Sequence, residues 1–132
     1  MLEDNIVLSQ FFFVSIGACF GTLARFNFVR YFQSIYELTF LGTLTVNILA
    51  SFALGLFISI EPLVFSQASL NSLILFFGVG FLGSLSTFSS FILDILQSIF
   101  DDRYKDAILI FLFSLIGGFV AIVIGYSIGK AW

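Results

Sequence analysis

The sequence predicts an all-α integral membrane protein with four transmembrane helices. Three observations support this fold class. Of the 132 residues, 60% are hydrophobic and only 10% are charged, whereas globular chains are about half apolar and about a quarter charged. The apolar residues fall into four long runs, and the linkers between the runs are too short for a separate domain. Because a soluble domain of this size cannot bury so much apolar surface, we expect lipid to surround the helices.

Each apolar run reaches the length of about 20 residues that a helix needs to cross the hydrocarbon core. The predicted helices cover roughly residues 6–32, 40–60, 70–100 and 107–128, and residues 1–132 form a single four-helix membrane domain. The second helix is expected to end at Glu61 and Pro62, because proline disfavours helical backbone in the residue before it. Short linkers make successive helices antiparallel, and a membrane-spanning sheet would need about eight strands or more.

Small residues recur four positions apart in three of the runs. These residues are Gly17 and Gly21, Ser51 and Gly55, and Gly117, Ala121 and Gly125. Such spacing lets helix backbones approach closely in lipid, so we expect helix–helix contacts at these positions.

The third run carries an unusual polar stretch in the middle of a membrane span. Three glycines precede five hydroxyl residues, namely Gly78, Gly80 and Gly83, then Ser84, Ser86, Thr87, Ser89 and Ser90. One interpretation is a broken helix whose carbonyl groups line a cavity or face a cation. The other is an intact helix whose hydroxyl groups bond back to their own carbonyls.

The composition argues against catalysis. The chain has no histidine, and its single cysteine, Cys19, excludes both an internal disulfide and a cysteine cluster. The serines and threonines lack an evident base to activate them. We therefore predict that the protein is not an enzyme. The net charge of −3, with no basic patch, gives no indication of nucleic-acid binding.

Ion handling suits the remaining polar residues better. Asn47 lies in the middle of the second run, where an amide is costly unless it has hydrogen-bond partners. It either bonds another helix or faces a pore, where its NH2 group can replace a water that donates to an anion. Phe88 and Phe91 flank Ser89 and Ser90. These rings either pack against lipid and core or turn their positive edges toward a small anion.

Two charged residues are predicted at membrane depth, Arg25 and Asp94. A charge at the bilayer centre costs about 2.5–3.5 kcal/mol, so such residues are candidates for function. Arg25 either serves a function or extends its side chain to the interface. Asp94 either serves a function or sits in a solvated vestibule.

Three segments together resemble the fluoride channel family known as Fluc or CrcB. They are residues 17–25 (GACFGTLAR), 42–55 (GTLTVNILASFALG) and 80–91 (GFLGSLSTFSSF). Their order and spacing and the chain length agree with the family, and the resemblance covers nearly the whole chain.

The resemblance implies a fold and a function. Family members are dimers of two antiparallel four-helix subunits with a break in the third helix. They export cytoplasmic fluoride passively across the cell membrane. The partner would be a second copy or a homologous second subunit. A structural Na⁺ at the dimer centre is implied, held by the backbone carbonyls of Gly83 and Ser86.

The resemblance also implies roles for individual residues. The residues that match the family's fluoride pore are Asn47, Phe88, Phe91, Ser89, Ser90 and Ser114. Further positions that match its functional motifs are Arg25, Thr87 and Asp94. Three positions depart from the usual pattern: Ser86 replaces Thr, Asp94 replaces Glu, and Ile110 stands one turn before Ser114 where many members have Tyr. With Ile110 in place of Tyr, this chain lacks one of the hydroxyl groups that line the pore in many family members.

The distribution of positive charge predicts a fixed orientation. The side with the first and third linkers carries Arg30, Arg103 and Lys105, whereas the opposite side has only Lys130. By the positive-inside rule, both termini would lie outside. The pore would then need an oppositely inserted partner.

Two other functions fit a chain of this size. A small four-helix proton-coupled multidrug exporter would carry a carboxylate deep in its first helix, but residues 6–32 contain neither Asp nor Glu. A membrane protein that only assembles with others through its small-residue faces would give no ion flux in liposomes.

Overall fold

The computed structural model describes residues 2–35, 39–64 and 72–131. Two continuous α-helices come first, α1 (Leu2–Ile35) and α2 (Thr39–Val64). The third span consists of three parts: the π-helix η1 (Ile74–Leu82), the short α4 (Gly83–Leu85) and α5 (Phe88–Phe100). The fourth span is α6 (Tyr104–Lys130). Four stretches are long and apolar enough to cross a membrane, namely Val7–Ile35, Phe40–Ile60, Ile74–Phe100 and Tyr104–Lys130. These stretches confirm the predicted all-helical, four-span membrane protein.

The helix ends differ from those predicted. The prediction that Glu61 and Pro62 close the second helix is wrong, because α2 continues to Val64. Proline disfavours helix in the residue before it without forbidding a last turn. Both α1 and α6 extend beyond the predicted ranges at each end, since hydropathy marks the lipid-crossing part of a helix rather than its ends. The predicted start of the third helix at Leu70 lies outside the described residues.

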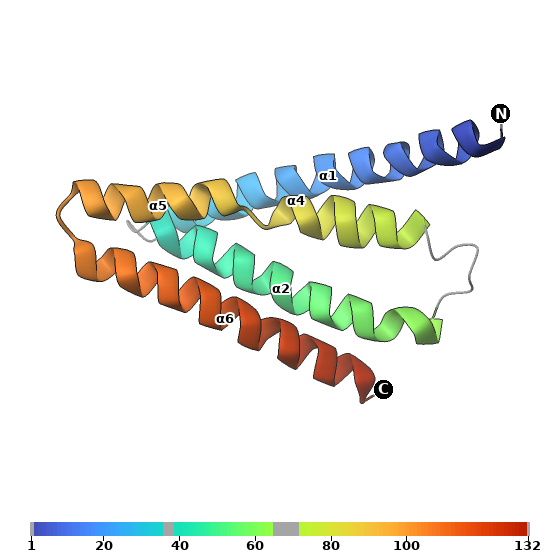
Figure 1. Ribbon diagram of the computed structural model, residues 1–132. Helices are drawn as coiled ribbons and strands as arrows, with labels where there is room; N and C mark the ends of the chain where they lie inside the picture. Colours follow the sequence, from blue (N-terminus) through green and yellow to red (C-terminus); the bar gives the residue numbers. More distant parts are fainter. Residues whose placement is uncertain (1, 36–38, 65–71, 132) are drawn as a thin grey trace.

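The spans pack in two close pairs. Helices α2 and α6 lie side by side, and α1 lies along η1 (Figure 1). The ends of α1 and α6 at Leu2 and Lys130 lie at one end of the bundle, and the α5–α6 turn lies at the other (Figure 1). The third span contacts α2 through η1, α4 and α5, and α5 also contacts α6. One face of α2 therefore meets both α5 and α6, and the candidate site forms there.

Glycines bring the paired helices into backbone contact. A Cβ atom on Gly125 would overlap the backbone oxygen of Phe52, and one on Gly55 would overlap that of Ile122. Gly17 meets η1 in the same way on the other side of the bundle. The predicted small-residue contacts are therefore present, and van der Waals packing between backbones holds these pairs together in lipid.

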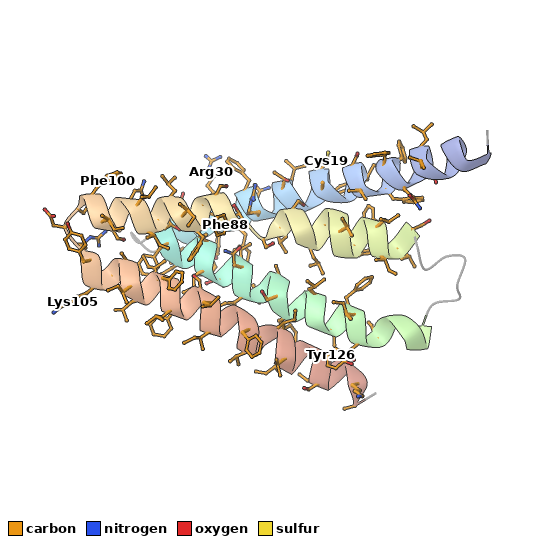
Figure 2. The ribbon with its side chains drawn as sticks, viewed as in Figure 1. Cys19, Arg30, Phe88, Phe100, Lys105 and Tyr126 are labelled. Atoms are coloured by element: carbon orange, nitrogen blue, oxygen red, sulfur yellow. The ribbon has the colours of Figure 1, made fainter. Side chains whose placement is uncertain are left out.

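Large apolar side chains cover the outside of the bundle. They stand out from all four spans (Figure 2), and Phe12, Phe113 and Phe119 are 65%, 60% and 70% exposed. The buried apolar residues are few and mostly small, for example Ala50, Ala107 and Ala121. Such a distribution suits a protein whose outer surface meets lipid.

Two residues in extended backbone separate α4 from α5. Ser86 has φ −73° and ψ 151°, and Thr87 has φ −145° and ψ 122°. The Thr87 side chain then caps α5, because its Oγ1 accepts a hydrogen bond from the Ser90 N–H at 3.3 Å. This cap satisfies one of the free N–H groups that every helix start leaves.

The backbone contact at Gly125 predicts a specific sensitivity. Gly125→Ala should destabilise the protein by about 1–3 kcal/mol, because the added methyl group forces α2 and α6 apart. Thermal unfolding of the purified protein in one detergent would measure the loss. The matched control is Gly118→Ala on the same helix, where the new Cβ would lie 3.5 Å from Ser51 Oγ in ordinary contact. Equal melting temperatures for the two variants would contradict the packing described here.

Candidate functional site

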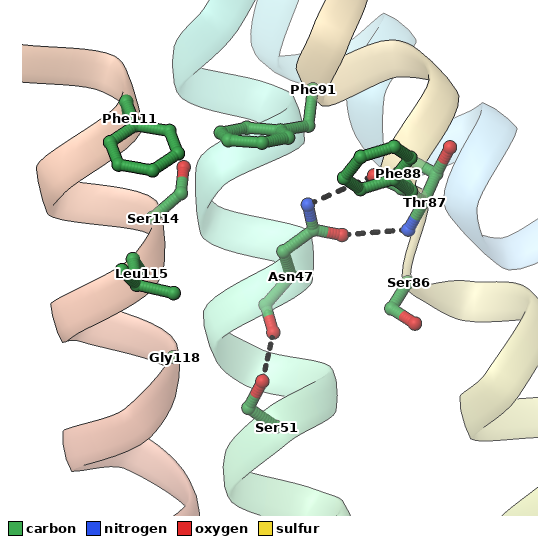
Figure 3. A pocket seen from close by; sticks show the side chains of 10 residues that line it. All are labelled: Asn47, Ser51, Ser86, Thr87, Phe88, Phe91, Phe111, Ser114, Leu115 and Gly118. Carbon is green, nitrogen blue, oxygen red and sulfur yellow. Dashed lines mark hydrogen bonds between the residues drawn. The ribbon is translucent and has the colours of Figure 1, made fainter. Parts of the chain in front are cut away.

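A pocket of about 350 Å³ opens between α2, α5 and α6 beside the extended residues. It is lined by Asn47, Ser51, Ser86, Thr87, Phe88, Phe91, Phe111, Ser114, Leu115 and Gly118 (Figure 3). Four of the six predicted pore residues therefore meet in one place, although they come from three separate segments. Its lining combines an amide, several hydroxyl groups and three aromatic rings.

Asn47 ties α2 to the extended backbone by two hydrogen bonds. Its Oδ1 accepts from the Thr87 N–H at 2.8 Å, and its Nδ2 donates to the Thr87 carbonyl oxygen at 3.2 Å (Figure 3). The two residues are 40 positions apart in the chain. A primary amide has two N–H donors, so this pairing uses one and leaves the other for the pocket. The hydrogen bond to another span is therefore present, and Asn47 also lines the pocket.

Hydroxyl groups supply further donors around the amide. The Ser51 hydroxyl donates to the Asn47 carbonyl oxygen of its own helix at 2.9 Å. By contrast, Ser114 is half-buried, lines the pocket and has no hydrogen-bond partner among the described residues. A hydroxyl in apolar surroundings without a partner is costly. Ser114 is therefore the free polar group best placed to bind a ligand in this pocket.

Three phenylalanine rings extend from α5 to α6. The ring centroids of Phe88 and Phe91 are 5.9 Å apart, and those of Phe91 and Phe111 are 6.3 Å apart. Phe88 is 74% exposed at the open side of the pocket, while Phe91 is half-buried within it. Phe111 is not among the pore residues predicted from the sequence. Its position three residues before Ser114 places both on one helical face, and that spacing is the signal that could have found it.

Ser89 and Ser90 do not line this pocket. Ser89 is exposed, and its Oγ lies 3.2 Å from the Thr87 Oγ1. Ser90 lines a different groove, together with Arg25. The structure thus places the two predicted hydroxyl groups beside Thr87 but on other sides of α5.

Asp94 lies one turn beyond Phe91, in a second pocket of about 380 Å³ that Arg103 also lines. It is only 9% exposed, and its Oδ2 atom is buried without a hydrogen-bond partner among the described residues. The Thr43 side chain, 4% exposed and one turn before Asn47, hydrogen-bonds the carboxyl group. Buried polar groups therefore continue from Asn47 toward the α5–α6 turn, and Thr43 is a second residue that the sequence analysis missed.

The backbone carbonyls of Gly83 and Ser86 suit a hard cation. In an α-helix the Gly83 carbonyl would accept from the Thr87 N–H, but that N–H donates to Asn47. The Ser90 N–H, the α-helical donor for Ser86, donates to Thr87 Oγ1. Carbonyls released from helical bonding in this way are the ligands by which unwound membrane helices hold Na⁺. Gly83 is exposed, and its carbonyl oxygen accepts a long hydrogen bond of 3.5 Å from the Ser86 hydroxyl.

Four apolar spans with a polar pocket at the level of non-helical backbone define a multi-pass membrane protein of the channel or transporter class. The chain belongs to the CrcB-like family, since the family model described as "CrcB-like protein, Camphor Resistance (CrcB)" matches residues 12–126.

Several named relatives are similar over most of the chain. The chain is 34% identical over 117 residues to "Fluoride-specific ion channel FluC 1" of Prochlorococcus marinus (strain MIT 9313), covering 89% of each protein. It is 37% identical over 122 residues to "Fluoride-specific ion channel FluC 2" of Prochlorococcus marinus (strain NATL2A), covering 92% of this chain and 98% of the relative. It is 34% identical over 125 residues to "Fluoride-specific ion channel FluC" of Thermosipho melanesiensis (strain DSM 12029 / CIP 104789 / BI429), covering 92% and 96%.

The paired bonds between Asn47 and Thr87 predict the effect of removing the amide. Asn47→Leu should weaken protection of the Thr87 amide against hydrogen–deuterium exchange, because a buried N–H without its acceptor costs about 1–3 kcal/mol. Mass spectrometry of peptides that cover residues 84–92 would measure this change. The control is Asn27→Leu, since Asn27 is exposed and its Nδ2 bonds only Leu23 of its own helix at 2.9 Å. Equal exchange in the parent and both variants would show that Asn47 does not hold this backbone.

Proposed function

We propose that this chain is a subunit of a fluoride-selective ion channel that exports cytoplasmic fluoride passively. The observation that carries the proposal is the meeting of Asn47, Phe88, Phe91 and Ser114 in one pocket. The family and the names of its relatives support the same function and give no support to an enzyme.

The pocket offers what a small anion needs after it loses water. Fluoride is strongly hydrated, so a selective path must replace many hydrogen bonds. The second N–H of Asn47 and the hydroxyl of Ser114 are free to donate, and the rings of Phe88 and Phe91 present positive edges. Each donor counts for more in a site of low dielectric than in water. A path made only of hydrogen-bond donors and ring edges lets fluoride move down its own gradient. Export therefore needs no residue that couples transport to protons or ATP.

The remaining candidate residues take supporting roles in this proposal. Thr87 holds the start of α5, and Ser89 and Ser90 add hydroxyl groups beside it. Asp94 lies beyond Phe91 on the way to the α5–α6 turn, where a pore mouth would be. Ile110 is 5% exposed one turn before Ser114, so this subunit has an apolar wall at that level.

We further propose that two subunits assemble antiparallel around the extended residues Ser86 and Thr87. Polar backbone in hydrocarbon is tolerated where protein covers it, which supports burying this stretch against a partner. The biased positions of Arg30, Arg103 and Lys105 favour one orientation per chain. The partner would then be an oppositely inserted copy or a homologous second subunit.

The carbonyls of Gly83 and Ser86 would hold a Na⁺ at the centre of this dimer, with the equivalent carbonyls of the partner. When bound, the ion would lower the electrostatic barrier that an anion meets in a low-dielectric environment. The chain's own contribution is twofold: the pairing of Asn47 with Thr87 takes the α-helical donor of the Gly83 carbonyl, and the Thr87 cap takes that of the Ser86 carbonyl.

Fluoride efflux from proteoliposomes tests the proposed path. The parent should release fluoride and retain chloride. Phe88→Ile and Asn47→Asp should each slow fluoride efflux, the second by about tenfold or more, because a hydrogen bond to a charged group is worth about 1.5–3 kcal/mol. A fluoride-selective electrode would follow the release.

A matched control variant is Phe119→Ile. Phe119 is 70% exposed on α6 and does not line the pocket, so its efflux should equal that of the parent. Equal chloride and fluoride flux in the parent would reject the function. Undiminished fluoride flux in both pocket variants would reject the site.

Withdrawal of sodium tests the proposed cation. Protein purified and reconstituted with N-methylglucamine in place of Na⁺ should lose most of its fluoride efflux, and restoring Na⁺ should recover it. Ser86→Ala should keep the dependence, because the proposed ligand is the backbone carbonyl. Full efflux after exhaustive removal of Na⁺ would contradict the assignment.

A further inference from the structure

A groove of about 460 Å³ lies on the side of α1 that faces α5. Its polar lining consists of Thr22, Arg25, Arg30 and Gln33 from α1, together with Ser90 from α5. Along α1 the lining residues Thr22, Phe26, Arg30 and Gln33 recur at spacings of four, four and three positions, which puts them along one side of the helix, and Arg25 follows Thr22 by three positions. The guanidinium groups of Arg25 and Arg30 therefore line one groove, which is separate from the pocket that Asn47 lines.

Neither arginine of this groove is neutralised. Among the described residues, no acidic side chain lines the groove or forms an ion pair with Arg25 or Arg30. Arg103 shows the contrast, since it lies 3.4 Å from Asp101 and 3.5 Å from Asp106. Within the part of the chain that the structure describes, the groove therefore combines two positive charges with no counter-charge, and its complement is an anion.

The position of the groove along α1 places it near a membrane surface. The span Val7–Ile35 has 29 residues, which is longer than the hydrocarbon core of about 30 Å requires at about 1.5 Å per residue. Arg30 and Arg25 precede the helix end at Ile35 by about 8 and 15 Å on the same rise. The long side chain of Arg25 can extend toward the surface along the groove. Arg30, labelled in Figure 2, is exposed.

We infer that this groove binds the phosphate headgroup of an anionic phospholipid in the leaflet on the side of the α5–α6 turn. Arginine pairs with phosphate through two parallel N–H donors, and basic pockets between membrane helices bind such headgroups. Phe26 lies between the two arginines in the groove lining and offers apolar surface to an acyl chain. This apolar part favours a lipid over a free inorganic anion.

Native mass spectrometry of the purified chain tests this inference. Equal amounts of phosphatidylglycerol and phosphatidylcholine with the same acyl chains would be offered in detergent. The parent should retain phosphatidylglycerol preferentially. Arg30→Gln should lower that retention about fivefold, the factor expected for one basic group at an anionic surface. Arg25→Gln combined with Arg30→Gln should lower it about 25-fold if the two side chains act independently.

Two controls identify the source of the effect. Lys105→Gln removes one positive charge from the same side of the bundle outside the groove, and it should leave retention unchanged. A loss in Lys105→Gln equal to that in Arg30→Gln, or equal retention of both lipids by the parent, would overturn the inference. Displacement of phosphatidylglycerol by millimolar inorganic phosphate would assign the groove to a free anion and overturn it as well. Since Arg30→Gln alters an exposed side chain at the end of α1, it remains informative even where the double variant fails to fold.

Discussion

The two hydrogen bonds between Asn47 and Thr87 are the constraint on which the site depends. They join residues 40 positions apart at 2.8 and 3.2 Å. Because the Thr87 N–H leaves the helical ladder to reach Asn47, the chain stays extended at this point and α5 restarts with Thr87 as its cap. The same step removes the α-helical donor of the Gly83 carbonyl, which accepts instead from the Ser86 hydroxyl at 3.5 Å, and sets the direction of Phe88 and Phe91. One amide thus determines where donors, rings and carbonyls lie.

The rest of the bundle provides a rigid frame for that interaction without a large apolar core. Backbone contacts at Gly55 and Gly125 hold α2 against α6, and a contact at Gly17 holds α1 against η1. Most large side chains face outward, where lipid solvates them. Because lipid is as apolar as the core, hydrophobicity does not press the helices together, and close backbone packing has to do so. Small residues at the contacts are therefore as important for the site as its polar groups.

The sequence predicted the four spans and the small-residue contacts, and it singled out Asn47 as an amide that needs partners within the membrane, because each rests on composition or on spacing within one helix. It did not predict that Ser90 lies in the groove with Arg25, or that Phe111 and Thr43 lie near the predicted pore residues. Those placements depend on how separate helices pack, which spacing along one helix does not specify. The π-helical form of residues 74–82 also escaped prediction, since hydropathy does not distinguish between helix types. The predicted end of α2 was too early because proline only disfavours helical backbone in the residue before it, whereas the prediction treated Pro62 as a helix terminator.

The central claim is that fluoride passes through the pocket beside Asn47, and a small thiol reagent can test it directly. In a Cys19→Ser background, Ser114→Cys would place one thiol in the pocket, and Ser127→Cys would place one on an exposed face of the same helix. Fluoride currents would be recorded in planar bilayers before and after Ag⁺ is added. If fluoride passes through this pocket, Ag⁺ should block the Ser114→Cys channel and leave the Ser127→Cys channel conducting. Unchanged current through silver-modified Ser114→Cys would contradict it.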